Sequence, residues 1–223
     1  MKSSSTPTTF RKPRQQRSRE SLSRIVQAAE DLLSGKGPEA VTVSRVTQKA
    51  GVSVGSFYAR FEGKDALLEH LGERLWEERR EAWEEFLSRP RWRRRPLPDL
   101  LRSIVRALVR GNARQQARLR SLALSACLNP ESSMSRRTAE LNEFLVDRVK
   151  GLLMDRKGEF DHPDPERAAG FGIRLVLGAL QQQVIFAETA WNPFDLSSSE
   201  LIEELTRCWV EYLGVKAPSP TVE

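Results

Sequence analysis

Three side chains that can grip a phosphate group lie close together early in the chain. They are the phenol of Tyr58, the guanidinium of Arg60 and the ammonium of Lys64. Groups of these types donate the hydrogen bonds that hold a nucleic-acid backbone in register. They directly follow the glycine-containing stretch A-G-V-S-V-G-S, residues 50–56, and both flanks of this region have the apolar spacing of helices. The cluster therefore indicates a surface for a polyanion, provided that helices present the three groups together.

Two short helices joined by a tight turn are predicted around that stretch. Thr42 is placed to cap the first of them, and Gly51 can end it with a sharp reversal. Ser53 is placed to cap the second helix, whose apolar Phe57 and Phe61 are spaced to face a core. This is the helix-turn-helix arrangement, and it leaves the phosphate-gripping side chains outside.

The flanking segments predict the rest of an N-terminal head. An apolar stripe over 18–34 predicts a first helix, which Gly35, Gly37 and Pro38 end. A long amphipathic helix is predicted over 64–87.

After this point the pattern stays helical. Residues 89–98, R-P-R-W-R-R-R-P-L-P, hold three prolines and form a basic connector rather than a helix. No segment shows the period-two alternation of a strand, so the chain is predicted to be all-α.

Further helices are expected over 98–128 with a break near 111–117, over 131–155, over 164–189 with Asp164 as cap, and over 197–213 with the capping box Ser197–Glu200. The predicted organisation is a disordered basic arm (1–17), a three-helix helix-turn-helix domain (18–64), a ligand-binding and dimerisation body (65–215) and a flexible tail (216–223).

Composition narrows the classes of function. The chain has 223 residues, 39% hydrophobic and 30% charged, with a formal net charge of +6 that favours a polyanionic partner. No apolar run approaches the length of a membrane span and no secretory signal is present, so a cytoplasmic protein without membrane contact is expected. Cys127 and Cys208 are expected to be free, buried thiols. No cofactor, metal ligand set or catalytic constellation is found, so an enzyme is not expected.

The stretch T-V-S-R-V-T-Q-K-A-G-V-S-V-G-S-F-Y-A-R-F-E-G-K-D-A-L-L, residues 42–68, is similar to the DNA-binding signature of the TetR/AcrR transcriptional regulators. The resemblance covers about 18–70. It departs from the family pattern at Thr47, where alanine is usual and where the hydroxyl is expected to bond back to the helix, and at Arg60, where histidine or tyrosine is common.

The resemblance implies a double-stranded DNA operator as partner. Residues of the second and third helices would then contact it, with phosphate roles for Tyr58, Arg60 and Lys64. The full set of candidate DNA contacts is Thr42, Ser44, Arg45, Ser53, Val54, Gly55, Ser56, Tyr58, Arg60 and Lys64.

For the body, the resemblance implies an effector site and a homodimer through the helices near 164–190 and 197–213. Effector candidates are the polar or aromatic residues that interrupt apolar stripes: Trp83, Asn112, Phe144, Phe171, Arg174 and Gln182. The expected mechanism is a repressor released from a palindromic operator when a small molecule tilts the helix over 65–87.

Two alternatives remain: an activator of the same family, or a helical module that binds a protein and has lost specific DNA binding. The Arg91–Arg95 cluster is a connector, or else attracts an acidic effector or a second stretch of DNA.

Overall fold

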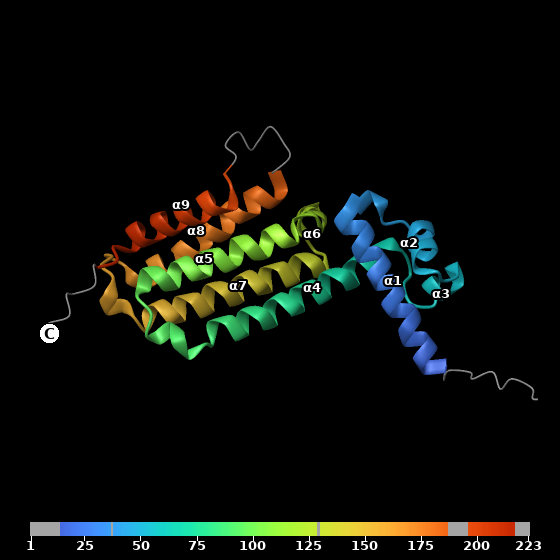
Figure 1. The fold of residues 1–223 in the computed structure, drawn as a ribbon, viewed down its shortest axis with the longest axis horizontal. Coiled ribbons are helices and arrows are strands. Elements are labelled where there is room, and N and C mark those ends of the chain that lie inside the picture. The colour runs from blue at the N-terminus through green and yellow to red at the C-terminus, as the bar shows by residue number, and fades with distance from the viewer. Residues whose placement is uncertain (1–13, 37, 129, 187–195, 217–223) are drawn as a thin grey trace, which may run out of the picture. The chain divides into compact units, whose positions relative to one another are not determined.

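The computed structural model describes residues 14–36, 38–128, 130–186 and 196–216, and the chain divides into two compact units (Figure 1). The first unit, Met1–Leu68, is called the head, and the second, Glu69–Glu223, is called the body. The described residues form α-helices, short 3-10 turns and one isolated bridge between Phe160 and Val215, so the all-α prediction is confirmed. The division falls inside one long helix, slightly beyond the predicted boundary at residue 64.

The described part of the head consists of three helices and the start of a fourth. Its elements are α1 (Arg14–Lys36), the 3-10 turn η1 (Pro38–Ala40), α2 (Val43–Ala50), α3 (Val54–Tyr58) and the first residues of α4 (Lys64–Leu87). Helix α1 begins at Arg14, so the last residues of the predicted disordered arm are helical. The remainder of that arm, residues 1–13, lies outside the described residues, as do 217–223 of the predicted tail.

The head has its own small core, which fixes α3 in place. Ile25 of α1, Val46 of α2 and Phe57 of α3 are all completely buried. Phe57 also packs on Phe61, with ring centroids 5.6 Å apart, as the i, i+4 spacing predicts. Since α3 has only one turn or so, this anchor decides which of its side chains stay outside.

The body consists of the rest of α4 and of five further helices among the described residues. These are α5 (Leu97–Arg114), α6 (Gln116–Leu128), α7 (Ser133–Met154), α8 (Pro165–Phe186) and α9 (Ser198–Leu213), with 3-10 turns η2 (Pro90–Arg93) and η3 (Lys157–Glu159). The predicted break near 111–117 is confirmed by the end of α5 and the start of α6. Helices α5, α7, α8 and α9 run side by side in Figure 1, and α5 packs on both α8 and α9.

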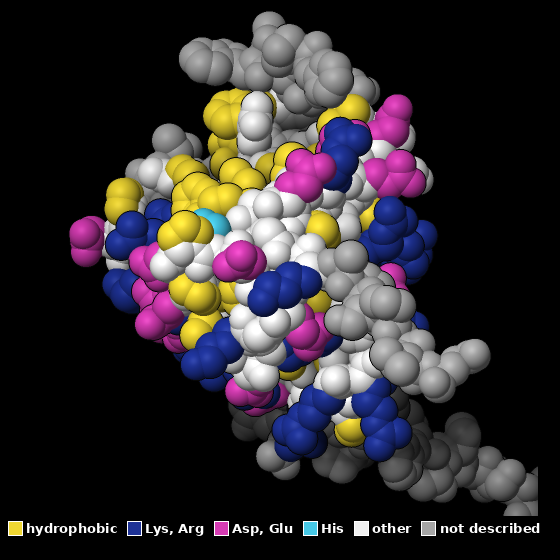
Figure 2. Space-filling model, turned by 90° about the vertical axis from the view of Figure 1, so that its left-hand side faces the viewer, with side chains coloured by type: hydrophobic (Ala, Val, Ile, Leu, Met, Phe, Trp, Pro, Cys, Tyr) yellow, Lys and Arg dark blue, Asp and Glu magenta, His cyan; other side chains and the backbone are white. Residues whose placement is uncertain are grey.

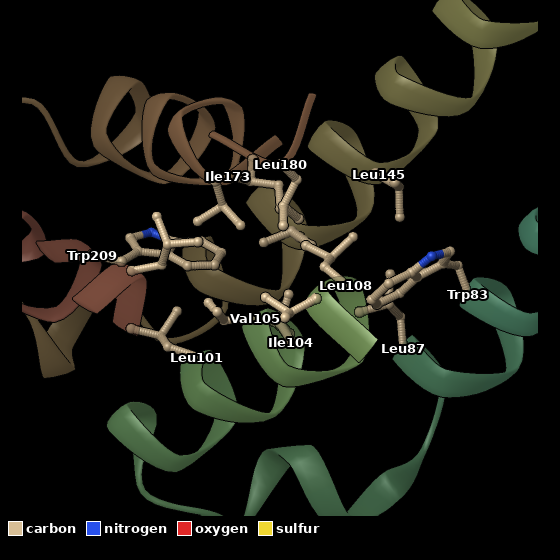
Figure 3. Close-up of a cluster of buried hydrophobic side chains, with 14 of the residues drawn as sticks. Trp83, Leu87, Leu101, Ile104, Val105, Leu108, Leu145, Ile173, Leu180 and Trp209 are labelled. Carbon is tan, nitrogen blue, oxygen red and sulfur yellow. The ribbon is translucent and has the colours of Figure 1, made fainter. Parts of the chain in front are cut away.

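Helix α5 is the centre of the body's core. Its inward residues Leu101, Ile104, Val105 and Leu108 are buried, and Figure 3 shows them between the side chains of α4 on one side and those of α8 and α9 on the other. Trp209 enters this core from α9. Burying large apolar side chains of this kind stabilises the fold by about 1.5–3 kcal/mol each.

Two of the helix starts in the body confirm the predicted caps. Asp164 accepts a hydrogen bond from the backbone N–H of Arg167 at 3.0 Å, directly before the first residue of α8. Ser197 and Glu200 form a reciprocal capping box at the start of α9. The turn W-N-P-F-D, predicted between these helices, lies outside the described residues.

The arginine-rich connector between α4 and α5 is built around a buried tryptophan. The Nε1 of Trp92 donates to the carbonyl of Phe86 at 2.5 Å, and the guanidinium of Arg91 lies over the indole at 4.4 Å. Arg156, which follows α7, donates to the backbone carbonyls of Trp92 (3.0 Å) and Arg95 (2.8 Å). The connector is therefore a fixed joint in the body. This supports the interpretation of the Arg91–Arg95 cluster as a connector rather than as a binding site.

Helix α8 corrects the expectation that no apolar segment approaches the length of a membrane span. Among the described helices it is the one long and apolar enough to cross a bilayer by length and composition alone. Its residues Ala168, Ile173, Val176 and Leu180 are, however, buried in the body's core. A core helix of a globular protein passes the same composition test.

The prediction that both cysteines are buried is wrong, since Cys127 and Cys208 are free but exposed. On α9 the inward positions are taken by Leu205, Thr206 and Trp209, so the helical period places Cys208 on the outer side.

Candidate nucleic-acid interface and body cavity

The turn between α2 and α3 has the geometry that the sequence predicts. Gly51 has φ 61° and ψ 41°, the left-handed conformation that favours glycine. Its carbonyl accepts a hydrogen bond from Nη1 of Arg24 at 3.3 Å, which ties the turn to α1. The angle between the two short helices is thus set by a backbone conformation that a side chain would strain.

The opening of α3 presents small and exposed side chains. Ser53 caps the helix by accepting from the backbone N–H of Ser56 at 3.1 Å, and the two hydroxyls lie 2.9 Å apart. Val54 is 50% exposed and Gly55 is exposed too. These residues can present hydroxyl and methyl groups to a DNA groove. None of them has a long side chain that ends in a hydrogen-bond donor.

Tyr58 is the exposed aromatic of α3. It is 56% exposed, and its ring stands edge-to-face on the buried ring of Phe57 at 5.5 Å. The buried phenylalanine therefore supports the tyrosine from beneath, which limits the number of conformations that its ring can adopt.

Arg60 has a partner inside the head. Its Nη2 donates to the backbone carbonyl of Ser18 at 2.6 Å and also contacts the Ser18 hydroxyl. The arginine that departs from the family pattern thus links the end of α3 to α1. Part of its guanidinium is committed to this link, so a phosphate could be contacted only by its remaining N–H groups.

The residues predicted on α2 lie at its start. The Thr42 hydroxyl accepts from the backbone N–H of Arg45 at 3.3 Å, and both Ser44 and Arg45 are exposed. The departure at Thr47 behaves as expected, because its buried hydroxyl donates to the carbonyl of Val43 at 2.8 Å. Lys64, half-buried, is the first residue of α4.

The body contains a largely apolar cavity of about 410 Å³ between its helices. Its apolar walls come mainly from leucine, valine and isoleucine side chains of α5 to α8. The polar side chains are Arg79 of α4, Asn112 of α5, Ser135, Thr138 and Asn142 of α7 and Gln181 of α8. This volume is within the range of small-molecule sites in proteins.

The effector candidates named from the sequence are not gathered in this cavity, apart from Asn112. Trp83 is buried in the core, and Phe144 is half-buried beneath the guanidinium of Arg80, 5.1 Å from its ring centroid. Phe171, Arg174 and Gln182 lie exposed on α8. They do not line the cavity.

The cavity residues that the sequence reading missed include Trp76 and Arg79. Both lie on the inward stripe of α4, together with Leu75, Trp83 and Leu87. The position of Arg79 inside an apolar helical stripe could have indicated a cavity residue, since arginine is rarely buried unless it is paired.

Comparison with known proteins agrees with this architecture. Residues 25–71 match the family model described as bacterial regulatory proteins, tetR family. The HTH-type transcriptional regulator YvdT of Bacillus subtilis (strain 168) is 38% identical over 52 residues, which is 23% of this chain and 27% of YvdT. The match thus spans about a quarter of that relative's length.

Two solved structures share the fold over nearly the whole chain. A bacterial regulatory protein in the tetR family from Rhodococcus RHA1 is 17% identical, with a TM-score of 0.64, covering 88% of this chain and 98% of its own. FadR from Bacillus subtilis, solved in complex with stearoyl-CoA, is 20% identical, with a TM-score of 0.55, covering 86% and 97%. The helix-turn-helix head and the all-helical body of this chain have the fold of these regulators. Residues 25–71 thus resemble the tetR family of bacterial regulatory proteins, whose family model they match.

Proposed function

We propose that this chain works as a homodimer that binds a near-palindromic DNA operator and releases it when a small molecule enters the body cavity. The observation that carries the proposal is the surface of the helix-turn-helix unit. There the exposed Tyr58, supported by Phe57, follows the small side chains that open α3. In this interpretation Tyr58 and Lys64 hold phosphates, while Arg45 and Ser56 read bases or groove shape.

The homodimer is supported by an apolar stripe on the outer side of α8. Phe171 is 47% exposed and Leu175 is 42% exposed, and Gly178 follows one turn later, also exposed. The ring of Phe171 lies 5.4 Å from that of Tyr212 on α9, so the stripe continues onto that helix. Figure 2 shows hydrophobic side chains gathered beside a histidine on the face that it draws. A second copy of the chain would cover such a surface, and two heads would then read two half-sites.

The effector role of the cavity is supported by its position along α4. This helix contributes Trp76 and Arg79 to the cavity wall, and its first residues, Lys64–Leu68, belong to the head. A ligand that shifts α4 would therefore act on the head through one continuous helix. FadR from Bacillus subtilis, which shares this fold, was solved with stearoyl-CoA, and this supports a ligand site in such a body.

The test is binding of the full chain to duplexes selected from a genomic fragment pool, followed by fluorescence anisotropy across a salt series. We expect a selected duplex to bind at least about 100-fold more tightly than a scrambled one. The double variant Tyr58→Ala/Lys64→Ala should lose this preference, with a salt slope smaller by about one. Lys157→Ala, which removes an exposed cation of the body, is the control and should bind as wild type. Equal, weak binding of every duplex by wild type and variant would favour the protein-interaction alternative.

A further inference from the structure

We propose that the body cavity binds a monoanionic molecule with an apolar body, and that Arg79 and Trp76 of α4 hold its carboxylate. The proposal rests on the proposed function in one respect, because it takes this cavity as the effector site. It adds the chemical class of the effector and the residues that select it.

The first step is the charge of the cavity wall. Among the described residues that line it, Arg79 is the one cation, and no aspartate or glutamate occurs there. Asn112 accepts a hydrogen bond from Nη2 of Arg79 at 2.8 Å, and an amide oxygen of this kind carries no net charge. Burial lowers the pKa of the Arg79 guanidinium to about 10, so the group is still protonated at neutral pH. The wall therefore carries a positive charge without a counter-charge.

The second step is the pair of unused donors. Within the described part of the chain, neither the buried Nε of Arg79 nor the buried Nε1 of Trp76 has a hydrogen-bond partner. The two residues are three apart on α4, so their side chains leave the helix on the same face. A buried donor without an acceptor costs about 1–3 kcal/mol. Both residues line the cavity, so a small turn of their side chains would bring these donors to an acceptor bound inside it.

The third step is the choice of anion. A carboxylate has two oxygens, so it can accept from a guanidinium and from an indole N–H at once. It also carries one charge, which Arg79 alone can balance. A doubly charged phosphate would leave a negative charge in the apolar cavity, and a cationic ligand would face the guanidinium directly. The remaining volume is walled mainly by aliphatic side chains, including Leu108, Leu145 and Leu180, which suit a hydrocarbon body.

The test uses three probes that share an eight-carbon chain and differ in charge: octanoate, octan-1-ol and octylamine. Binding of each to the full chain is measured by titration calorimetry at pH 7. For wild type we expect octanoate to bind at least about tenfold more tightly than octan-1-ol, and octylamine to bind most weakly. Such a preference corresponds to one well-compensated charge.

Two variants and one control assign the preference to α4. Arg79→Gln should bring the affinity for octanoate to within about threefold of that for octan-1-ol. Trp76→Phe keeps an aromatic ring but removes the indole N–H, so it should weaken octanoate about 3–10-fold and leave octan-1-ol unchanged. Arg106→Gln, an exposed arginine of α5 that does not line the cavity, should bind all three probes as wild type does.

Several results would overturn the proposal: equal affinities of octanoate and octan-1-ol for wild type, an undiminished preference in Arg79→Gln, or no binding of octanoate up to 5 mM. Should Arg79→Gln fail to fold, as judged by circular dichroism, Trp76→Phe decides the question. Operator binding is measured on the same samples. Octanoate binding that depends on Arg79 without any effect on DNA would uphold the site and count against the proposed regulation.

Discussion

Trp209 of α9 lies directly over Gly172 of α8, and a Cβ added at Gly172 would overlap the indole ring. Both residues are buried in the body, so the glycine is what allows the two helices to approach there. On the same helix, Gly170 and Gly178 have open space around the position of a Cβ. Of these three glycines, only Gly172 is thus required by the fold of the monomer.

Gly172→Ala is therefore expected to destabilise the body. Overpacking at a tight contact costs about 1–3 kcal/mol, because Trp209 must move from its place in the core. Gly170→Ala is the matched control and should be neutral or stabilising by up to about 1 kcal/mol, since alanine favours a helix. Thermal unfolding followed by circular dichroism, at one fixed protein concentration, measures both. Equal stability of the two variants would contradict the close contact.

Gly51→Ala should weaken DNA binding by distorting the helix-turn-helix turn. The left-handed conformation at this position costs a residue with a side chain about 1–2 kcal/mol. Gly55→Ala makes the contrasting change: its Cβ would meet only the Ser53 hydroxyl oxygen, at 3.9 Å, so the head should keep its stability. The added methyl group stands on the exposed opening of α3, however, and should still reduce operator affinity. Unfolding and anisotropy measured side by side separate the two effects.

Leu175→Asp is expected to convert the proposed homodimer into a monomer. A carboxylate placed in an apolar interface loses its hydration without gaining a partner. Leu124→Asp is a suitable control, because Leu124 of α6 is similarly exposed, at 38%, and lies outside α8 and α9. Analytical ultracentrifugation distinguishes the two outcomes. A dimer that survives the first change and not the second would place the subunit interface elsewhere.

Binding of octanoate should be independent of pH between about 6 and 9 and should fall outside that window. On the alkaline side Arg79 loses its proton near its lowered pKa of about 10, and the attraction disappears. On the acidic side the carboxylate itself is protonated below about pH 5. Because the pKa of Arg79 is higher in the unfolded chain than in the folded one, the ligand-free protein should gain stability as the pH rises above 10. Calorimetry at five pH values tests this pH window. An octanoate affinity that stays constant above pH 10 would argue against Arg79 as the partner of the carboxylate.

Much of this fold could be predicted from the sequence, because it depends on local signals. Gly51, Ser53 and the Ser197–Glu200 capping box each act within a few residues, and the structure contains all of them where expected. The start of α1 was predicted less well, since this helix begins at Arg14 rather than at residue 18.

The side-chain partners could not be predicted in the same way, because they join residues far apart in the sequence. Arg60 bonds to Ser18, and Arg79 bonds to Asn112; neither pairing follows from periodicity. Phe171 is an effector candidate by sequence because an aromatic residue there interrupts an apolar stripe, but the structure leaves it exposed. Its helix has two apolar sides, and sequence alone does not say which one is inside.

The hydrogen bonds from Arg156 to the arginine-rich connector have a mechanical consequence for α4. Arg156 fixes the segment that follows the C-terminal end of α4, through the carbonyls of Trp92 and Arg95. Arg79 lies about 12 Å along the helix from that end, and Lys64 about 35 Å, at 1.5 Å per residue. A rigid tilt of α4 about this joint would displace each of its residues in proportion to the distance from the joint. A displacement of a few tenths of an ångström at Arg79 would then grow roughly threefold at the residue where α4 begins.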